Sequence, residues 1–432
     1  MSEYFKKTFS VLSTQVLILP LTVLAGIIIA RFLGPAGKGS LTLIVLIATT
    51  MKLLGGMGME FANVYYASKE RKSLPNIISN NIVVWLFSTT VLICIFILIR
   101  PFLCTSILKN IHPQIINFAI IVFPFILGYG FVQTLFQGLE KFKEYNILRI
   151  SEPATKLTLV VLLIIVFKLN IKGGFIAILL SYVVPVILSI VLIKNYVKYP
   201  LSINKKHLVK SIKYGLKGQV GIFFQFFNYR LDMFLVSYYL DIREVGLYAL
   251  SVVIAEFLWY IPNSISVTLF PKVSAKDTRS ANEFTRKVSR TSITIMLMAG
   301  SVICLVAPFL IRLFYGERFI ESVIPLRILI PGVIAFGMVK ILTGHLHGRG
   351  KPQYGSIVTV CSLLLTILFD LLLIPRLGIT GAALATTFAY LFSFVLTLVF
   401  FVNVTGLSLK EILIPDFGSV YLVLRRIFRM KK

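Results

Sequence analysis

The 432-residue chain is 57% hydrophobic and only 14% charged, with a mean hydropathy of +0.90 and a formal net charge of +27. Soluble domains carry about 25% charged residues, and no soluble fold of this length could hide so much apolar surface from water. The composition therefore excludes a soluble protein and predicts an integral membrane protein.

Apolar runs of about 20 residues predict bilayer-crossing helices, because each residue rises about 1.5 Å across a hydrocarbon core of about 30 Å. The first half of the chain contains six such runs, at residues 11–30, 41–66, 80–99, 114–136, 150–168 and 173–193. The second half contains six more, at residues 214–240, 245–270, 291–313, 322–346, 355–374 and 379–402. These runs are too long for barrel strands and lack their alternation. They predict an all-α membrane protein with about twelve transmembrane helices.

The basic residues are distributed unevenly between the two sides of the membrane. With the N-terminus placed in the cytoplasm, 29 of the 44 Lys and Arg residues fall in inner segments and 10 in outer loops. This is the positive-inside pattern, and an even number of helices also places the C-terminus inside. Basic loops beside anionic lipid headgroups account for the net charge, so nucleic acid is not expected as a partner.

Two sequence similarities indicate an internal duplication. "RFLGPAGKGSLTL" (31–43) is similar to "YYLDIREVGLYAL" (238–250) when Gly39 is set against Gly246, an offset of 207 residues. "LNIKGGFIA" (169–177) matches "LGITGAALA" (377–385) at an offset of 208 residues. We predict a six-helix bundle over 1–193, a basic linker over 194–213, a second six-helix bundle over 214–402 and an interfacial tail over 403–432. Two repeats of six helices are parallel, which suits alternating access around a central cavity.

Three longer segments resemble one family. They are "RFLGPAGKGSLTLIVLIATTMKLLGGMG" (31–58), "VGLYALSVVIAEFLWYIPNSISVTLFPKVS" (245–274) and "LLLIPRLGITGAALATTFAY" (371–390). They resemble polysaccharide-type flippases, the branch of the multidrug/oligosaccharidyl-lipid/polysaccharide (MOP) exporter superfamily that carries O-antigen and capsule repeat units. One departure is Asp370, which stands where the family's pattern has asparagine. The resemblance implies a flippase that moves undecaprenyl-pyrophosphate-linked oligosaccharide from the inner to the outer leaflet of the cytoplasmic membrane.

Charged residues inside the spans are the candidate site residues, because such charges are costly and usually face a cavity or a partner. Arg230 is the first choice for the pyrophosphate, since a guanidinium matches phosphate oxygens and stays charged. Lys52 is second, and Gly55, Gly56 and Gly58 beyond it would let the backbone bend. The remaining cationic candidates are Lys340 and Lys156. Four carboxylates are candidates for coupling to H⁺ or Na⁺: Asp232, Glu60, Glu256 and Asp370.

Other interpretations stay open for these charges and for the function. Arg230 and Asp232 are two residues apart on one helix, so each is expected to find a partner on another helix, where it could serve structure alone. A peptidoglycan-precursor flippase, or a multidrug/cation antiporter of the same superfamily, would share the fold. An enzyme is not expected, because the sequence has no DxD motif, no GxxxxGK[ST] phosphate loop and no large loop for catalytic groups.

Partners and cofactors follow from the same observations. The expected partners are the lipid-linked oligosaccharide, membrane lipid and polymerase or ligase machinery, and a monomer is the default because one chain contains both repeats. The four cysteines and four histidines lack metal-ligand spacing, so no metal or other cofactor is expected beyond a coupling ion.

Overall fold

The computed structural model describes residues 2–70, 73–106, 110–194, 196, 203–275, 277–416 and 418, and helices dominate these residues. The first six helices in chain order are α1 (Ser2–Gly55), α2 (Met59–Lys69), α3 (Leu74–Thr105), α4 (Pro113–Gly138), α5 (Phe142–Val160), followed by the π-helical turn η2 (Val161–Val166), and α6 (Asn170–Lys194). The others are α7 (Lys205–Tyr239), α8 (Ile242–Glu256), the 3₁₀ turn η3 (Phe257–Trp259), α9 (Tyr260–Ala275), α10 (Thr278–Tyr315), the 3₁₀ turn η4 (Glu317–Ser322), α11 (Val323–Gly348), α12 (Gln353–Thr405) and α13 (Leu409–Leu413).

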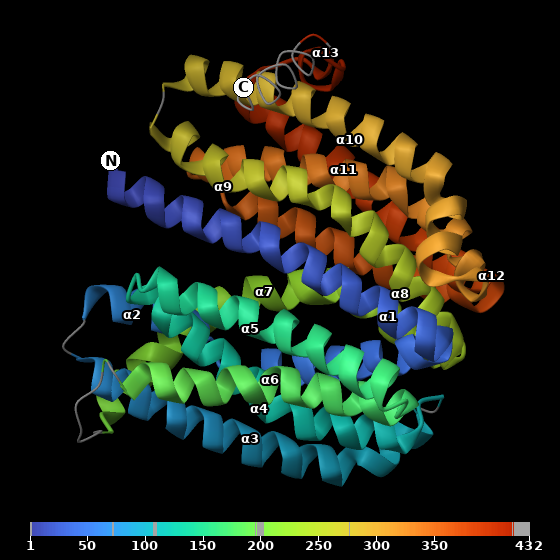
Figure 1. Ribbon diagram of the computed structural model, residues 1–432. Helices are drawn as coiled ribbons and strands as arrows, with labels where there is room; N and C mark the ends of the chain where they lie inside the picture. The colour runs from blue at the N-terminus through green and yellow to red at the C-terminus, as the bar shows by residue number, and fades with distance from the viewer. Residues whose placement is uncertain are drawn as a thin grey trace, which may run out of the picture. The chain divides into compact units, whose positions relative to one another are not determined.

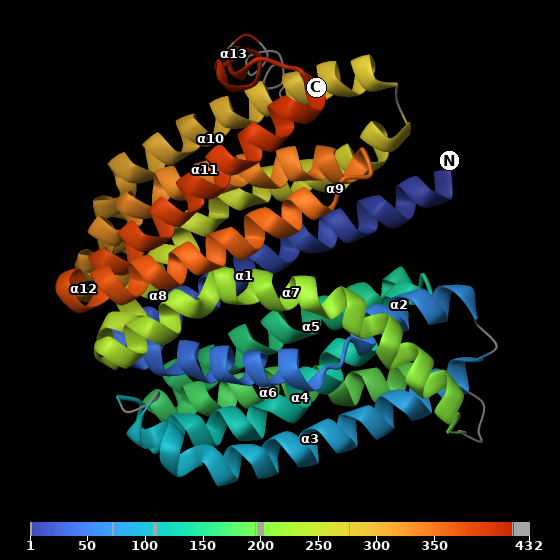
Figure 2. The ribbon, with the colours of Figure 1, turned by 180° about the vertical axis from the view of Figure 1, so that it is seen from behind.

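Two of the longest helices are helical hairpins. The backbone of α1 leaves helical geometry at Gly34 (φ 68°) and that of α12 at Gly378 (φ 60°), and in both cases the chain folds back on itself (Figures 1 and 2). A left-handed φ favours glycine, because it lacks a Cβ. The stretch around residues 31–43 is therefore a turn between two spans.

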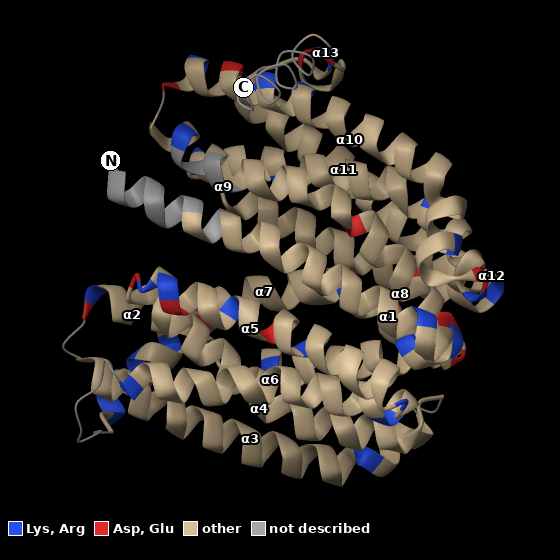
Figure 3. Ribbon diagram, viewed as in Figure 1, with Lys and Arg blue, Asp and Glu red and all other residues tan. Residues whose placement is uncertain are grey.

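The membrane character and the helix count agree with the sequence. Among the described residues, eight helical segments are long and apolar enough to cross a bilayer. Two of these are the α1 and α12 hairpins, and α5 with η2 and α7 supply two further long helices. The all-α class is confirmed, and about twelve transmembrane helices are compatible with the structure. Figure 3 shows long stretches of helix without charge and Lys and Arg mostly near helix ends.

The chain separates into two compact units. The first comprises residues 1–223 with 241–246, and the second comprises residues 224–240 with 247–432. This division falls within α7, and the domain bounds given by the sequence stay predictions. Part of the linker (195 and 197–202) and half of the tail (417 and 419–432) lie outside the described residues.

Equivalent helices form the centres of the two units. In the first unit α4 contacts α1, α2, α3, α5 and α6, and in the second α11 contacts α9, α10 and α12. Both helices are 26 residues long, and α11 begins and ends 210 residues after α4. The turns before the last span also match, because Asn170 (φ 49°) lies 208 residues before Gly378. These correspondences support the predicted duplication.

The repeated glycines touch each other within the first unit. A Cβ on Gly39 would lie 2.0 Å from the Ile242 carbonyl oxygen, and a Cβ on Gly246 would lie 1.9 Å from the Pro35 carbonyl oxygen. Gly39 and Gly246 are 207 residues apart, as are Pro35 and Ile242, so the contact is reciprocal. Only residues without a side chain allow two backbones to approach this closely.

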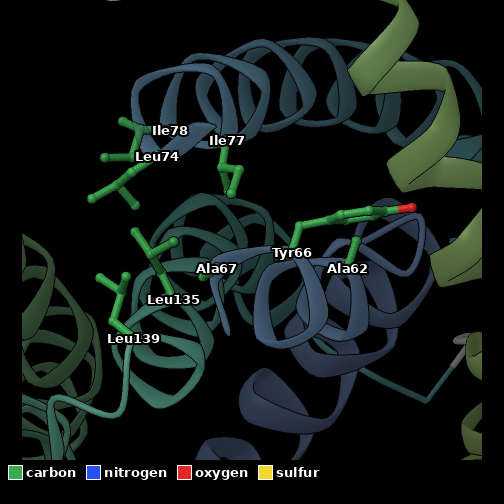
Figure 4. Close-up of a cluster of buried hydrophobic side chains, with 8 residues drawn as sticks. All are labelled: Ala62, Tyr66, Ala67, Leu74, Ile77, Ile78, Leu135 and Leu139. Carbon is green, nitrogen blue, oxygen red and sulfur yellow. The ribbon is translucent and has the colours of Figure 1, made fainter. Parts of the chain in front are cut away.

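A hydrophobic cluster fixes the short helix α2 on its neighbours in the first unit (Figure 4). Ala62, Tyr66 and Ala67 of α2 are nearly inaccessible and meet side chains of α3 and α4, including Ile77 and Leu135. The small alanines let α2 lie close to these helices. The cluster therefore holds α2 in place after the chain has bent.

Candidate functional site

The second span of each repeat is interrupted near its middle. The second arm of α1 ends at Gly55, and the chain turns through Met57 (φ 45°) and Gly58 (φ 72°) before α2 begins. In the second repeat, η3 separates α8 from α9. Interrupted helices at corresponding positions in the two halves of a transporter point to its binding site.

In the first unit an ion pair bridges the interruption. Lys52 lies before the turn and Glu60 after it, and Lys52 Nζ is 2.7 Å from Glu60 Oε1, with both side chains partly exposed. Gly130 of α4 leaves the space for this pair, since a Cβ there would lie 2.0 Å from Glu60 Oε1 and 2.9 Å from Lys52 Cε. Two predicted site residues therefore neutralise each other across the bend.

In the second unit Arg230 of α7 is paired with Glu256 at the end of α8. Arg230 donates from Nη1 to Glu256 Oε1 at 2.9 Å and from Nη2 to Oε2 at 3.1 Å. This two-point geometry is the strongest form of an Arg–carboxylate pair. Arg230 and Asp232 thus find separate partners on other helices, as the sequence predicted.

Lys340 of α11 has a different environment from the other three predicted cations. Its ammonium lies 3.8 Å from the centre of the Trp259 ring and 5.3 Å from that of the Tyr229 ring, and it donates to Asn263 Oδ1 at 3.1 Å. Trp259 is fixed by donating from Nε1 to the Val333 carbonyl at 2.9 Å. Within the described part of the chain, no carboxylate lies within ion-pair distance of Lys340.

Asp232 and Asp370 are buried carboxylates in the second unit. Asp232 accepts hydrogen bonds from the Tyr248 hydroxyl at 2.6 Å and from the Met233 backbone N–H at 2.7 Å, and Thr386 lies at 3.5 Å. Asp370 is fully buried, and neither of its carboxylate oxygens has a hydrogen-bond partner among the described residues. The two carboxylates are close enough to interact electrostatically.

A small cavity in the second unit lies beside both Asp232 and Glu256. Its lining includes Asp232, Glu256, Trp259, Thr386 and Tyr390. It therefore lies between the Arg230–Glu256 pair and the buried Asp232. The cavity therefore adjoins two of the predicted coupling carboxylates, Asp232 and Glu256.

Lys156 differs from the other predicted cations because its partner lies on the same helix. It lies on α5, and its ammonium is 3.5 Å from Glu152 one turn earlier on the same helix. The described residues include no group of three or more His, Cys, Asp or Glu that could hold a metal ion.

Sequence reasoning did not single out several residues that complete this site. They are Trp259 and Asn263 beside Lys340, Tyr248 beside Asp232, and Gly130 beneath the Lys52–Glu60 pair. Trp259 and Asn263 lie in the quoted 245–274 segment, where a polar amide just after an indole in an apolar span was an available signal. Nothing in the sequence indicates that Gly130 faces Lys52.

The repeated helices, interrupted second spans and embedded charges define a multi-pass membrane transporter. Residues 4–276 match the family described as "Polysaccharide biosynthesis protein", and residues 220–372 match the family MatE. The chain belongs to the Polysaccharide biosynthesis protein family, so the resemblance to polysaccharide-type transporters seen in the sequence is confirmed. The relatives and solved structures whose names state a role are flippases or transporters, which agrees with the expectation that the chain is not an enzyme.

Individual relatives are distant in sequence. The chain is 24% identical over 380 residues to the uncharacterized membrane protein MJ1375 of Methanocaldococcus jannaschii, covering 83% of this chain and 88% of that protein. It is 23% identical over 202 residues to the "Probable low-salt glycan biosynthesis flippase Agl15" of Haloferax volcanii, covering 46% of this chain and 42% of that protein. The chain thus spans less than half the length of that flippase in this match.

Solved structures share the fold across nearly the whole chain. A structure of the "Lipid II flippase MurJ, inward closed conformation" has a TM-score of 0.78 and 15% identity, covering 94% of this chain and 89% of MurJ. An inward-facing multidrug resistance MATE transporter of the MOP superfamily has a TM-score of 0.64 and 15% identity, covering 89% and 94%. At such identities the likeness establishes the fold alone.

Proposed function

We propose that the chain is a flippase for polyprenyl-pyrophosphate-linked oligosaccharide repeat units, with undecaprenyl as the carrier. It moves them from the inner to the outer leaflet of the cytoplasmic membrane by alternating access, with both termini in the cytoplasm. The observation that carries this proposal is that each unit has embedded cations near its second span: Lys52 in the first unit, and Arg230 and Lys340 in the second. Family membership and the names of Agl15 and MurJ support it.

The physical requirement for such cargo matches these features. A pyrophosphate and several sugars must cross about 30 Å of hydrocarbon, while the polyprenyl tail can remain in lipid. The cargo therefore needs cations and polar groups inside the membrane-spanning part of the protein, where charge is otherwise costly. Lys340 with Asn263 supplies such groups, and the Lys52–Glu60 and Arg230–Glu256 pairs keep further polar groups inside the membrane-spanning part. The default oligomeric state is a monomer, with polymerase or ligase as downstream partners.

We further propose that Asp232 and Asp370 carry the coupling cation, H⁺ or Na⁺. Two carboxylates that interact in a buried site disfavour simultaneous ionisation, so a proton or a metal cation relieves their repulsion. The unpartnered oxygens of Asp370 support this role, and Tyr248 and Thr386 supply further oxygen atoms. Glu60 and Glu256 are less suited to it, because each is already neutralised by a basic partner.

The test is transport in proteoliposomes. The purified protein is reconstituted with a fluorescent polyprenyl-pyrophosphate oligosaccharide in one leaflet, and in separate vesicles with labelled lipid II or with a fluorescent organic cation. We expect translocation of the oligosaccharide lipid. Preferential translocation of lipid II would instead favour the peptidoglycan-precursor flippase, and export of the cation would favour the antiporter.

The coupling proposal is tested in the same vesicles with imposed pH or Na⁺ gradients. A gradient of the coupling ion should accelerate transport by the wild type. The Asp370→Asn variant keeps the side-chain size and removes the charge, so it should lose this acceleration. An Asp370→Asn variant that responds to either gradient like the wild type would refute the role of Asp370.

A further inference from the structure

We propose that Lys340, rather than Arg230, is the residue that binds the cargo's pyrophosphate in the second unit, with Asn263 positioning its ammonium. The proposal rests on the proposed function for the identity of the cargo. It also makes a claim about pyrophosphate binding that can be measured without transport.

The argument starts from the partners of the predicted cations. Lys52, Lys156 and Arg230 each have a carboxylate within 3.5 Å, at Glu60, Glu152 and Glu256. Binding an anion at any of them requires either breaking an ion pair or placing a second negative charge beside the carboxylate. Breaking one of these pairs leaves its carboxylate without a partner in the membrane-spanning part, where an uncompensated charge is costly. These three cations are therefore poorly available to a pyrophosphate.

Lys340 has no carboxylate within ion-pair distance among the described residues, although Glu256 is near enough to act on its charge. Its ammonium has three donors, and one of them is used by Asn263 Oδ1 at 3.1 Å. The faces of Trp259 and Tyr229 attract its charge, but a ring face supplies no negative charge for a phosphate to displace. The Arg230–Glu256–Lys340 group thus carries one net positive charge, and Lys340 is the member that provides it.

The position of Lys340 also suits an arriving headgroup. Asn263 is exposed and Lys340 is half-buried, so phosphate oxygens can reach the ammonium from the side that the Trp259 ring does not cover. Asn263 lies on α9, one turn beyond η3. The site is therefore next to the 3₁₀ turn in the second span of this repeat, the place that corresponds to the break between α1 and α2 in the first repeat.

Two variants remove the available charge in different ways. Lys340→Gln deletes it. Asn263→Asp keeps Lys340 but places a carboxylate at the 3.1 Å contact, which gives Lys340 the same kind of partner as the other cations. Because this second change adds an ion pair, it is expected to leave the fold intact even if Lys340→Gln does not. Lys340→Arg is the conservative control.

The matched control for Arg230 is the double variant Arg230→Ala/Glu256→Ala, which removes the ion pair as a unit. Arg230→Ala alone would leave Glu256 unpaired, and that carboxylate would draw Lys340 into a new pair. The double variant leaves the net charge near Lys340 unchanged. It therefore separates a binding role for Arg230 from its effect on Glu256.

Binding is read from Trp259. The chain has two tryptophans, so in a Trp85→Phe background Trp259 is the only indole and reports a displacement of the ammonium above it. Full-length protein in detergent is titrated with inorganic pyrophosphate and with farnesyl pyrophosphate. We expect saturable changes in fluorescence and a Kd that rises about 10- to 100-fold in Asn263→Asp and Lys340→Gln, the loss of one charge-assisted hydrogen bond. Lys340→Arg should bind more tightly than Lys340→Gln, and the double variant should bind like its Trp85→Phe parent.

The outcomes decide whether Lys340 or Arg230 binds the pyrophosphate. The proposal would be overturned if both Asn263→Asp and Lys340→Gln bound pyrophosphate with wild-type affinity. It would also be overturned if the double variant Arg230→Ala/Glu256→Ala lost affinity while Asn263→Asp did not. Failure of the proposed function looks different, because the wild type would then not translocate the oligosaccharide lipid although pyrophosphate binding still depended on Lys340. Translocation at the wild-type rate by both Lys340→Gln and Asn263→Asp would overturn the Lys340 assignment and leave the flippase proposal standing.

Discussion

The reciprocal contact between Gly39 and Gly246 makes a quantitative prediction about stability. A Cβ on either glycine would lie 1.9–2.0 Å from a carbonyl oxygen across the contact, whereas ordinary contact begins at 3.4 Å. Each Gly-to-Ala change therefore requires the two backbones to separate by about 1.4 Å, the difference between those distances. Overpacking of a close contact costs about 1–3 kcal/mol in the free energy of unfolding.

The symmetry of the contact determines how the two changes combine. Because the same separation relieves both clashes, the double variant Gly39→Ala/Gly246→Ala should cost about as much as one single variant. That corresponds to a coupling energy of about 1–3 kcal/mol, well above the few tenths expected for independent sites. Alanine also stabilises a helix by about 1 kcal/mol relative to glycine. The change in the free energy of unfolding of each variant is therefore compared with that of a control Gly-to-Ala variant.

The assay is equilibrium unfolding of the purified protein in mixed micelles by titration with a denaturing detergent. The control is Gly26→Ala, where a new Cβ would meet nothing within 4 Å and only the helix propensity changes. Costs that add in the double variant would refute the shared contact. A Gly39→Ala variant as stable as Gly26→Ala would refute the close approach itself.

Three further predictions concern other parts of the molecule. Gly130→Ala places a Cβ 2.0 Å from Glu60 Oε1, so it should slow flipping more than Gly26→Ala does, and equal rates would contradict a role for that ion pair. Burial lowers the pKa of His207 below its ordinary 6.5, so protonation of this side chain favours unfolding. The stability of the protein should therefore fall as the pH drops below about 6.5. The loss in melting temperature between pH 7.5 and 5.5 should be smaller in His207→Gln than in the wild type, and an equal loss in both would exclude this contribution. At the start of α10 the Asp277 carboxylate accepts a hydrogen bond from the Ser280 N–H at 3.0 Å, which lowers the pKa of Asp277. Asp277→Ala should therefore lower the melting temperature at neutral pH, and this difference should disappear in acid as the carboxylate of the wild type is protonated. A difference between the two proteins that does not change with pH would point to another cause.

The sequence predicted the class of fold because hydropathy acts locally. A run of 20 apolar residues needs a membrane whatever surrounds it, and the hairpin turns at Gly34 and Gly378 follow from glycine's access to a left-handed φ. The duplication was also visible, because both repeats kept glycines at two matching places. The paired positions of α4 and α11 then agree with that period.

The sequence alone could not rank the charged residues as candidates for binding the headgroup. Arg230 was the first choice for the headgroup on chemical grounds, yet it is paired at two points with Glu256, which lies 26 residues away in the sequence. Lys340 was one candidate among four, and its distinction is the environment formed by Trp259 and Asn263. Hydropathy and spacing report which charges enter the membrane but give no distance between them.

The sequence by itself determined that this protein spans a membrane many times, is built from two repeats and belongs among the polysaccharide transporters. Those properties depend on composition, periodicity and short motifs, each contained within one stretch of chain. Only the tertiary structure decided which charges neutralise each other, that Asp370 is buried without a hydrogen-bond partner among the described residues and that Lys340 contacts Trp259 and Asn263. The reason is that an ion pair depends on the distance between two side chains, and that distance is set by helix packing between segments far apart in the sequence.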